Sequence, residues 1–506
     1  MRKHLLTFLL ACLLGSSVHA TWSIVVVNRR TGEVAVGSAT CLQSINLTIG
    51  LPVLRIGKGA GAIQAASGGS SGLLIMFDQF GDDVDSVSLL AAVLAADPSP
   101  VDRQIGLVSM VGIPQTFTGS RAGRARGGVR GEFGDYAYAI QGNVITGSAV
   151  FREARNTLIA TPGDLAEKLM AAMETARFYG GDGRCSCDLN RAFSCGSPPP
   201  SFTKSAHVGF MLIGRIGDVD APCIDRNGND CASAPYYMRL NVAGTDATMS
   251  SPDPVFQLRD LYDDWRADHV GRPDGTLSTA QGVQSMPADG RSQRSFTVRL
   301  RDIDGTPLRS GGAEVLVSPA PGSLALSTIG DVQDNGDGSY SFLVTSGTTP
   351  GQEQLMVTAD DGYLKATLFP YIDLRTDAIA PLHVGYDTLS AAQNPAVPMV
   401  VQFSGASEER FFLLASLAGS SPGTQLGELL LPLNRPLLHP YIGNRQSPTL
   451  SGQVGHLDPS GRAELSFQPD PVVALALVGR RVDWAAILLR RGALQSTPAA
   501  GYDVLP

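Results

Sequence analysis

The sequence predicts an α+β protein of three folded parts, in which a domain of sheets and helices precedes two all-β sandwiches. Strand patterns and helical spacing follow one another in the first half of the chain, whereas short alternating strands without helical spacing dominate after Ser295. The chain has 506 residues, which suits three domains at about 100–200 residues each. We expect a first domain at 21–269, a linker at 270–292, an immunoglobulin-like sandwich at 293–376 and a second sandwich at 380–506.

Residues 1–20 have the composition of a cleavable signal peptide. The basic pair Arg2-Lys3 precedes an apolar run over residues 5–14, and the segment ends in small residues at Ala20. The run is too short to cross a bilayer. The alternative is a lipoprotein, in which an acylated Cys12 would become the first residue. Cleavage after Ala20 predicts a secreted or periplasmic protein.

Cleavage at that point would give Thr21 a free α-amino group. A threonine hydroxyl is a weak nucleophile until a base removes its proton, and a neutral α-amine on the same residue can serve as that base. The resulting hypothesis is an N-terminal threonine hydrolase, activated by export, that cleaves an amide bond in a small-molecule or peptide substrate.

The first domain starts with a strand over 22–28, a turn at Arg29-Arg30-Thr31-Gly32 and a strand over 33–41. The same patterns predict further strands at 60–67, 104–111, 135–142 and 206–214, and helices at 84–96, 147–160, 163–178 and 254–265. This order suits a layered pair of sheets flanked by helices.

The cysteines indicate disulfides. Of seven cysteines, Cys12 lies in the leader, and five of the other six fall in a turn-rich insert expected at 183–235. An even number in an exported chain favours bridges that staple this insert. Zinc is the alternative, but His207 is the only nearby histidine and the spacing is not that of a zinc finger. The string Asp225–Asp230 lacks the distant glutamate of an EF-hand and predicts an Asx turn, so no metal or cofactor is expected.

The second half of the chain has the signature of sandwich domains. Strands expected at 296–300, 313–317, 339–344 and 354–358 are separated by turns such as Asn335-Gly336-Asp337-Gly338. Residues 380–506 repeat the alternation of strands with proline and glycine turns. Neither module gathers catalytic residue types, so both are candidates for contact with a cell-surface partner.

Charge argues against binding to nucleic acid, and hydropathy argues against a transmembrane helix after the leader. The net charge is −8 and there is no long run of lysine or arginine, which argues against nucleic acid. The basic stretch Arg121–Arg130 lies among glycines and predicts a mobile loop. No apolar run after the leader reaches the about 18 residues of a transmembrane helix. The sequence leaves the oligomeric state open and is compatible with a homo-oligomer.

Polar residues near strand ends are the candidates to assist Thr21. Asn143 is the preferred donor to a developing oxyanion and Gln64 is a second amide, although asparagine beside a glycine is commonly a turn residue. Arg55 could lower the pKa of the amine, or be a solvated loop charge. Asp182 could face the site, or its neighbouring glycines could simply end the preceding helix.

A competing motif is Gly68-Gly69-Ser70-Ser71-Gly72, which fits the G-x-S-x-G of a nucleophile elbow. Such a serine needs a later acid and a histidine. His207 and His269 are the histidines of the same domain, and neither is followed by a supporting pattern. We expect a chance match in a loop of small residues.

The first domain also carries an ordered set of segments that are specific only in combination. They are Thr21-Trp22-Ser23-Ile24-Val25, residues 32–38, residues 59–65, Asp102-Arg103-Gln104-Ile105-Gly106, Phe117-Thr118-Gly119, Gln141-Gly142-Asn143 and Gly180-Gly181-Asp182. Over residues 21–215 the chain resembles the family known as domain of unknown function 1028 (DUF1028), whose members look like N-terminal nucleophile hydrolases.

The resemblance implies a four-layer αββα sandwich, with the threonine exposed here by a signal peptidase instead of by loss of the initiator methionine. It supplies a fold and a nucleophile but no substrate. This chain departs from the family in the insertion of Cys185–Thr203 before Lys204-Ser205-Ala206, and in its C-terminal sandwiches. A second hypothesis is therefore a catalytically silent protein of the same fold that binds or adheres to a surface through its sandwiches.

Overall fold

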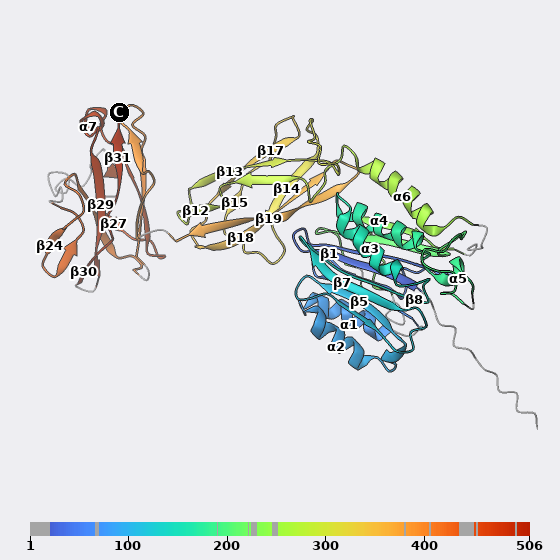
Figure 1. The fold of residues 1–506 in the computed structure, drawn as a ribbon. Coiled ribbons are helices and arrows are strands. Elements are labelled where there is room, and N and C mark those ends of the chain that lie inside the picture. The colour runs from blue at the N-terminus through green and yellow to red at the C-terminus, as the bar shows by residue number, and fades with distance from the viewer. Residues whose placement is uncertain are drawn as a thin grey trace, which may run out of the picture.

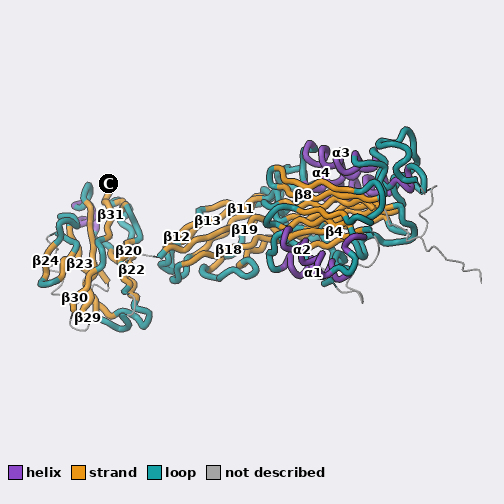
Figure 2. The backbone as a smooth tube through the Cα atoms, turned by 60° about the horizontal axis from the view of Figure 1, so that its bottom comes forward, coloured by secondary structure: helices purple, strands orange, loops and turns teal. Residues whose placement is uncertain are grey.

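The computed structural model describes residues 21–65, 70–189, 191–220, 222–223, 230–244, 251–378, 381–403, 406–434, 450–451, 454–490 and 493–506. Figures 1 and 2 show three parts in series: sheets with flanking helices, then one β-sandwich, then another. The expected leader, most of the Asp225–Asp230 string and the start of the Gly68–Gly72 motif lie outside the described residues.

The first part contains two antiparallel sheets whose neighbouring strands are often distant in the chain. The six-stranded sheet has the order β10-β9-β2-β1-β8-β7, and the four-stranded sheet has the order β3-β4-β5-β6. Their bounds are β1 Thr21–Asn28, β2 Glu33–Thr40, β3 Pro52–Arg55, β4 Gly59–Gln64, β5 Gln104–Ser109, β6 Gln115–Thr118, β7 Gly127–Phe133, β8 Tyr136–Asn143, β9 Val208–Gly214 and β10 Met238–Val242.

Alternation along β1 explains how the layers stack. Val25 and Val27 pack into an apolar layer that both sheets share, whereas Ile24 and Val26 pack against helices. The helices on the six-stranded sheet are α3 (Ala149–Ala160), α4 (Leu165–Phe178) and α6 (Pro254–His269). Those on the four-stranded sheet are α1 (Ser70–Gly81) and α2 (Ser86–Ala96). Figure 1 shows the two sets of helices on opposite outer faces.

The helix starts follow local sequence signals. Asp85, Asp164 and Asp253 precede α2, α4 and α6, and each accepts a hydrogen bond from a backbone N–H of the first turn. Pro254 then occupies the first turn of α6, where its missing N–H costs nothing. Short helical turns also form at η1 (Pro100–Asp102) and α5 (Gly183–Ser186).

The basic stretch expected as a mobile loop is partly a strand. Arg130 lies in β7, which pairs with β8 along the edge of the six-stranded sheet. Its glycines weaken the strand pattern, and pairing with the buried β8 outweighs that weak propensity.

The six cysteines of the described residues form three disulfides, as predicted. Two of them close short loops in the insert, Cys187–Cys195 and Cys223–Cys231. The third, Cys41–Cys185, instead joins the end of β2 to α5 across 144 residues of sequence.

The stretch expected as a linker supplies strands to the first sandwich. Its strands β11 (Thr279–Gly282) and β12 (Ser285–Pro287) pair with β13 and β19. The Gly/Ser/Pro composition masked this role, because an edge strand needs backbone pairing more than apolar side chains. A buried ion cluster anchors the start of the stretch: Arg215 contacts Glu33 at 2.8 Å and Asp274 at 2.6 Å, and lies over the ring of Tyr237.

The first sandwich packs two sheets around an apolar core that includes Phe296, Phe342 and Leu355. One sheet has the order β11-β13-β17-β15 with β16 beside β17, and the other has the order β12-β19-β18-β14. The remaining bounds are β13 Gln293–Arg299, β14 Glu314–Pro319, β15 Thr328–Ile329, β16 Gln333–Asp334, β17 Ser339–Thr345, β18 Gly351–Asp360 and β19 Lys365–Asp377.

The C-terminal part is a second pair of sheets around a core that includes Phe411, Trp484 and Tyr502. The sheets have the orders β20-β22-β28-β26 and β21-β31-β29-β23-β27, with β30 beside β29 and a separate hairpin of β24 and β25. The bounds are β20 Leu382–Val384, β21 Thr388–Ser390, β22 Val397–Gln402, β23 Arg410–Ser416, β24 Thr424–Leu426, β25 Leu429–Leu431, β26 Leu450–Ser451, β27 Val454–His456, β28 Arg462–Phe467, α7 Pro471–Ala476, β29 Arg481–Arg490, β30 Ala493–Ser496 and β31 Ala500–Leu505. Among the described residues, no helix has the length and apolar character needed to cross a membrane.

Candidate functional site

The layer between the two N-terminal sheets changes from apolar to polar at one end. On β1 the inward positions Val27 and Val25 are followed by Ser23 and Thr21. The same change occurs on β2, β4, β5 and β8. The buried polar residues at this end are Thr21, Ser23, Ser38, Thr40, Gln64, Gln104, Gln141 and Asn143. Buried polar side chains are costly unless they are hydrogen-bonded, so this polar end is a candidate site.

Thr21 is at the centre of the polar end, with 3 % of its surface exposed. Its backbone N donates to Asn143 Oδ1 at 3.1 Å, because Thr21 and Asn143 are paired across β1 and β8. Its carbonyl accepts a hydrogen bond of 2.8 Å from Gln64 Nε2. Its hydroxyl donates to Thr40 Oγ1 at 3.3 Å. Thr21 thus has Asn143 and Gln64 as direct neighbours, and the hydroxyl of Thr40 beside its own.

Side-chain amides and the hydroxyl of Ser23 form a hydrogen-bonded chain that includes Gln64, the donor to the Thr21 carbonyl. Gln141 Nε2 donates to Ser23 Oγ at 2.6 Å, and Ser23 Oγ donates to Gln64 Oε1 at 2.7 Å. Gln64 Nε2 also reaches Gln104 Oε1 at 2.6 Å, and Gln104 Nε2 donates to the carbonyl of Gly142 at 3.0 Å. These bonds satisfy buried polar groups and fix the rotamer of Gln64.

Asp182 and Arg184 approach from the start of α5. Asp182 is fully buried and accepts from the backbone N of Cys41 at 2.6 Å and from Arg184 Nη2 at 2.8 Å. Arg184 Nη2 also lies 3.5 Å from Thr40 Oγ1, at the long limit of a hydrogen bond. Asp182 caps α5 by accepting from the backbone N of Arg184, so it both begins a helix and faces the site.

His207 lies beside this group with its Nε2 3.3 Å from Gln43 Nε2. Burial lowers the pKa of His207, and the nearby ammonium of Lys204 lowers it further. The imidazole is therefore neutral at pH 7. His207 also lies within 4.8 Å of the sulfurs of Cys41 and Cys185, but these are joined in a disulfide and are not thiolate ligands. This trio therefore does not form a metal site in the oxidised chain.

Arg55 does not belong to the Thr21 cluster. Arg55 pairs with Gly59 at the start of β4, whereas Gln64 ends that strand. Its guanidinium binds Asp220 at 2.9 Å and lies 4.5 Å from the centre of the Phe77 ring. The length of β4 therefore separates Arg55 from the amine that it was expected to influence.

Sequence reasoning did not single out Thr40, Ser23 or Arg184. For Thr40 and Ser23 a usable signal exists, because alternate positions on β1 and β2 change from valine to hydroxyl residues towards the same end of the sheet. Arg184 carries no such signal. It lies in a cysteine-rich insert whose position depends on long-range contacts.

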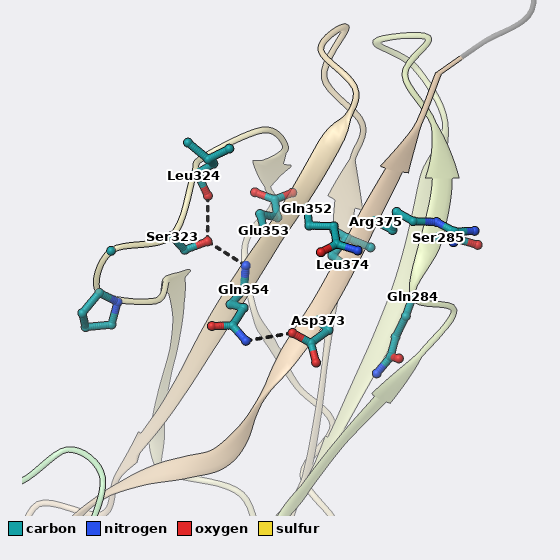
Figure 3. A pocket seen from close by; sticks show the side chains of 12 residues that line it. Gln284, Ser285, Ser323, Leu324, Gln352, Glu353, Gln354, Asp373, Leu374 and Arg375 are labelled. Atoms are coloured by element: carbon teal, nitrogen blue, oxygen red, sulfur yellow. Dashed lines mark hydrogen bonds between the residues drawn. The ribbon is translucent and has the colours of Figure 1, made fainter. Parts of the chain in front are cut away.

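A second candidate site is a groove of about 760 Å³ on the outer face of the sheet that contains β18 and β19 (Figure 3). Gln352 and Gln354 line it from β18, and Asp373 and Arg375 line it from β19. Gln354 Nε2 donates to Asp373 Oδ1 at 2.8 Å. The loop at Ser323 forms one wall, since its hydroxyl accepts from the backbone N of Gln354 at 2.7 Å. The groove offers amide, carboxylate and guanidinium groups to solvent.

Two family models match separate parts of the chain. Residues 21–189 match the family model DUF1028, described as a family of unknown function. This chain carries a DUF1028 domain. The DUF1028 domain supplies Thr21, Asn143 and Asp182. Residues 275–368 match the family model of invasin domain 3, and they contain the groove residues Gln352 and Gln354.

Solved structures match parts of the chain at low identity. A DUF1028 protein from Silicibacter pomeroyi is 16 % identical with a TM-score of 0.34, and the match covers 48 % of this chain and 85 % of that one. The adhesin InvE of Yersinia pseudotuberculosis is 17 % identical with a TM-score of 0.19, over 46 % of this chain and 60 % of that one. The Escherichia coli adhesin FdeC is 14 % identical with a TM-score of 0.19, over 47 % and 66 %. No curated protein matches the chain significantly.

Proposed function

We propose that this protein is an exported surface protein that binds a cell-surface partner through its invasin-type sandwich. The observation that carries the proposal is the match of residues 275–368 to invasin domain 3. Disulfides in the N-terminal domain support an oxidising, extracytoplasmic location. Figures 1 and 2 show the sandwiches in series beyond the DUF1028 domain, where they present their sheet faces to solvent.

The groove is the proposed contact surface on that sandwich. Its four outward side chains, Gln352, Gln354, Asp373 and Arg375, are exposed and alternate with buried residues of the core. They hydrogen-bond through amides, a carboxylate and a guanidinium, so the complementary surface must be polar.

A direct test compares binding of the labelled full chain, exported with its disulfides, to intact cultured epithelial cells. Gln354→Ala/Asp373→Ala removes two groove side chains, and we expect it to weaken binding about tenfold. Gln293→Ala/Ser295→Ala on the opposite sheet is the matched control, because both residues are exposed and outside the groove. Equal binding of both double variants would reject the groove, and no binding by the parent chain would reject the adhesion proposal.

A second candidate function is a threonine hydrolase in the DUF1028 domain, favoured by the constellation around Thr21. The stacking of two sheets between two sets of helices supports this candidate, because the DUF1028 resemblance implies the αββα sandwich of N-terminal nucleophile hydrolases. In the proposed reaction the Thr21 hydroxyl attacks an amide carbonyl while the α-amine takes its proton. The side-chain amide of Asn143 or Gln64 stabilises the oxyanion after a small rearrangement on substrate binding. The amine then protonates the leaving nitrogen, and water hydrolyses the ester.

The hydrolase proposal is tested by mass spectrometry on the exported chain treated with a β-lactone, which acylates an activated hydroxyl. We expect one adduct on an N-terminal Thr21. Thr21→Ala should lose the adduct and Thr21→Ser should keep it, because serine retains the hydroxyl and the amine. Ser70→Ala is the control for the rival G-x-S-x-G motif and should react as the parent does. An unreactive parent chain, or a reactive Thr21→Ala, would reject this function.

A further inference from the structure

The disulfide Cys41–Cys185 joins the segment whose Thr40 contacts the Thr21 hydroxyl to the segment whose Arg184 contacts Thr40. Cys41 follows Thr40, whose Oγ1 lies 3.3 Å from Thr21 Oγ1. Cys185 follows Arg184, whose Nη2 lies 3.5 Å from Thr40 Oγ1. Thr21 contacts Thr40, and Thr40 contacts Arg184, so each cysteine of this disulfide is adjacent in sequence to one of these contacting residues. Neither of the other two disulfides has a cysteine adjacent in sequence to Thr21, Thr40 or Arg184.

The segment that carries Arg184 is anchored at its start by backbone hydrogen bonds from Asp182 N to the Ser205 carbonyl and from Gly183 N to the Val144 carbonyl, and the disulfide adds a covalent tether to the end of β2. Helix α5 has 4 residues, which is too short for a stable helix in isolation. The following residues, up to the cis bond before Pro198, contain no strand or further helix among those described. By contrast, Thr40 ends a strand whose eight residues are all buried. The disulfide thus connects a short helical turn, and the irregular residues that follow it, to a rigid strand.

Contacts of Asp182 orient the guanidinium within the tethered segment. Asp182 Oδ2 accepts from the backbone N of Cys41 at 2.6 Å and from Arg184 Nη2 at 2.8 Å. Asp182 Oδ1 accepts from Arg184 Nε at 3.1 Å. The carboxylate therefore holds the guanidinium by a two-point contact while it also binds the backbone beside the disulfide. The same carboxylate and the same disulfide fix Arg184 relative to Thr40.

A guanidinium at this place can favour the reactive form of Thr21 without exchanging protons. Arginine stays charged at all relevant pH values, so Arg184 acts by its field and its hydrogen bonds. Through Thr40 Oγ1 it orients the hydroxyl oxygen that accepts the Thr21 proton in the resting site. A fixed cation on that side also favours negative charge on the Thr21 oxygen during attack.

We infer that Arg184 is a positioning residue for Thr21, and that the Cys41–Cys185 disulfide holds it in place, so that the DUF1028 site is complete only in the oxidised chain. The inference rests on the hydrolase function proposed for Thr21. It deepens that function by adding a guanidinium and a disulfide that DUF1028 membership does not itself imply. Export would then supply two requirements together, a free threonine and an oxidised site.

The first experiment measures the rate of β-lactone acylation at Thr21 in the exported full chain. Cys41→Ser/Cys185→Ser should react about tenfold more slowly than the parent chain, because the Arg184 segment is released. The matched control is Cys187→Ser/Cys195→Ser, which removes a disulfide of the same insert and should stay within about twofold of the parent rate. Peptide mapping of each variant establishes that the chain begins at Thr21 and that the other disulfides are intact.

A second pair of variants leaves every disulfide in place. Arg184→Gln should also lower the acylation rate about tenfold while the melting temperature stays within a few degrees, and Arg184→Lys should recover much of the rate because it restores a cation. If Arg184 had only a structural role, Arg184→Lys would not recover the acylation rate that Arg184→Gln loses. If the parent chain reacts at Thr21 and both Arg184→Gln and the Cys41/Cys185 variant react equally fast, this inference is overturned alone. If the parent chain does not react, the hydrolase proposal and the inference are both overturned.

Discussion

The DUF1028 domain and the invasin-type sandwich place their glutamines in opposite environments. Gln64, Gln104 and Gln141 of the DUF1028 domain are buried between two sheets, where Gln64 bonds directly to Gln104 and, through Ser23, to Gln141. Gln352 and Gln354 of the sandwich face solvent. A buried amide costs free energy unless its hydrogen bonds are made, whereas an exposed amide costs almost nothing. Buried amides that converge on one residue therefore indicate a reactive site, whereas exposed amides on a sheet face indicate contact with a partner.

The largest stability effect that this comparison predicts is at the buried ion cluster where the two regions meet. Arg215→Met leaves the carboxylates of Glu33 and Asp274, both almost fully buried, without their cation, and should lower the free energy of unfolding by about 3–5 kcal/mol. Urea unfolding monitored by tryptophan fluorescence measures the change. Arg375→Met removes an arginine from an exposed pair with Asp377 and should change the same quantity by less than about 0.5 kcal/mol. Similar losses in both variants would contradict the contrast in burial.

A smaller effect on the free energy of unfolding distinguishes the buried glutamines from the exposed ones. Gln104→Ala deprives Gln64 Nε2 of an acceptor and the Gly142 carbonyl of a donor, and should cost about 2–3 kcal/mol of unfolding free energy. Gln354→Ala removes an exposed side chain and should cost no more than about 0.5 kcal/mol. Both values come from the same urea titration. If Gln104→Ala lowered the free energy of unfolding no more than Gln354→Ala does, the buried network would contribute nothing to the stability of the fold.

The smallest effect is a loss of stability in acid at the junction of the two sandwiches. Burial alone would raise the pKa of Asp289, but hydrogen bonds from Ser292, from the backbone of Arg291 and from Ser346 outweigh it and lower the pKa to about 2. A carboxyl with a lowered pKa stabilises the fold above its unfolded pKa near 3.8 and stops doing so as the pH falls towards 2.

We therefore expect Asp289 to contribute about 1–2 kcal/mol at neutral pH that disappears between about pH 4 and pH 2. Asp289→Asn should lose this contribution at pH 7 and show a flatter acid limb when melting temperature is followed against pH. The control is Asp373→Asn in the groove, whose carboxylate is exposed. An acid limb that is unchanged in Asp289→Asn would rule out the assigned role.

Local signals predicted much of the N-terminal domain. The β-branched run of β1 and the turn that follows it place the first two strands, and Asp164 with the leucine spacing of α4 places that helix. Local signals failed for β7, which is rich in glycine and arginine and is a strand because β8 pairs with it. They also failed for β11 and β12, where edge positions in the sandwich override a composition typical of linkers.

The candidate site shows the same division between local and long-range information. The sequence by itself predicted a leader before Thr21, six further cysteines available to pair, and strands that end at Asn143 and Gln64. Only the tertiary structure decided that Asp182 meets Cys41 and Arg184 meets Thr40, and that Arg55 lies at the far end of β4. The physical reason is that strand register and a disulfide across 144 residues bring these side chains together, and no local pattern records either one.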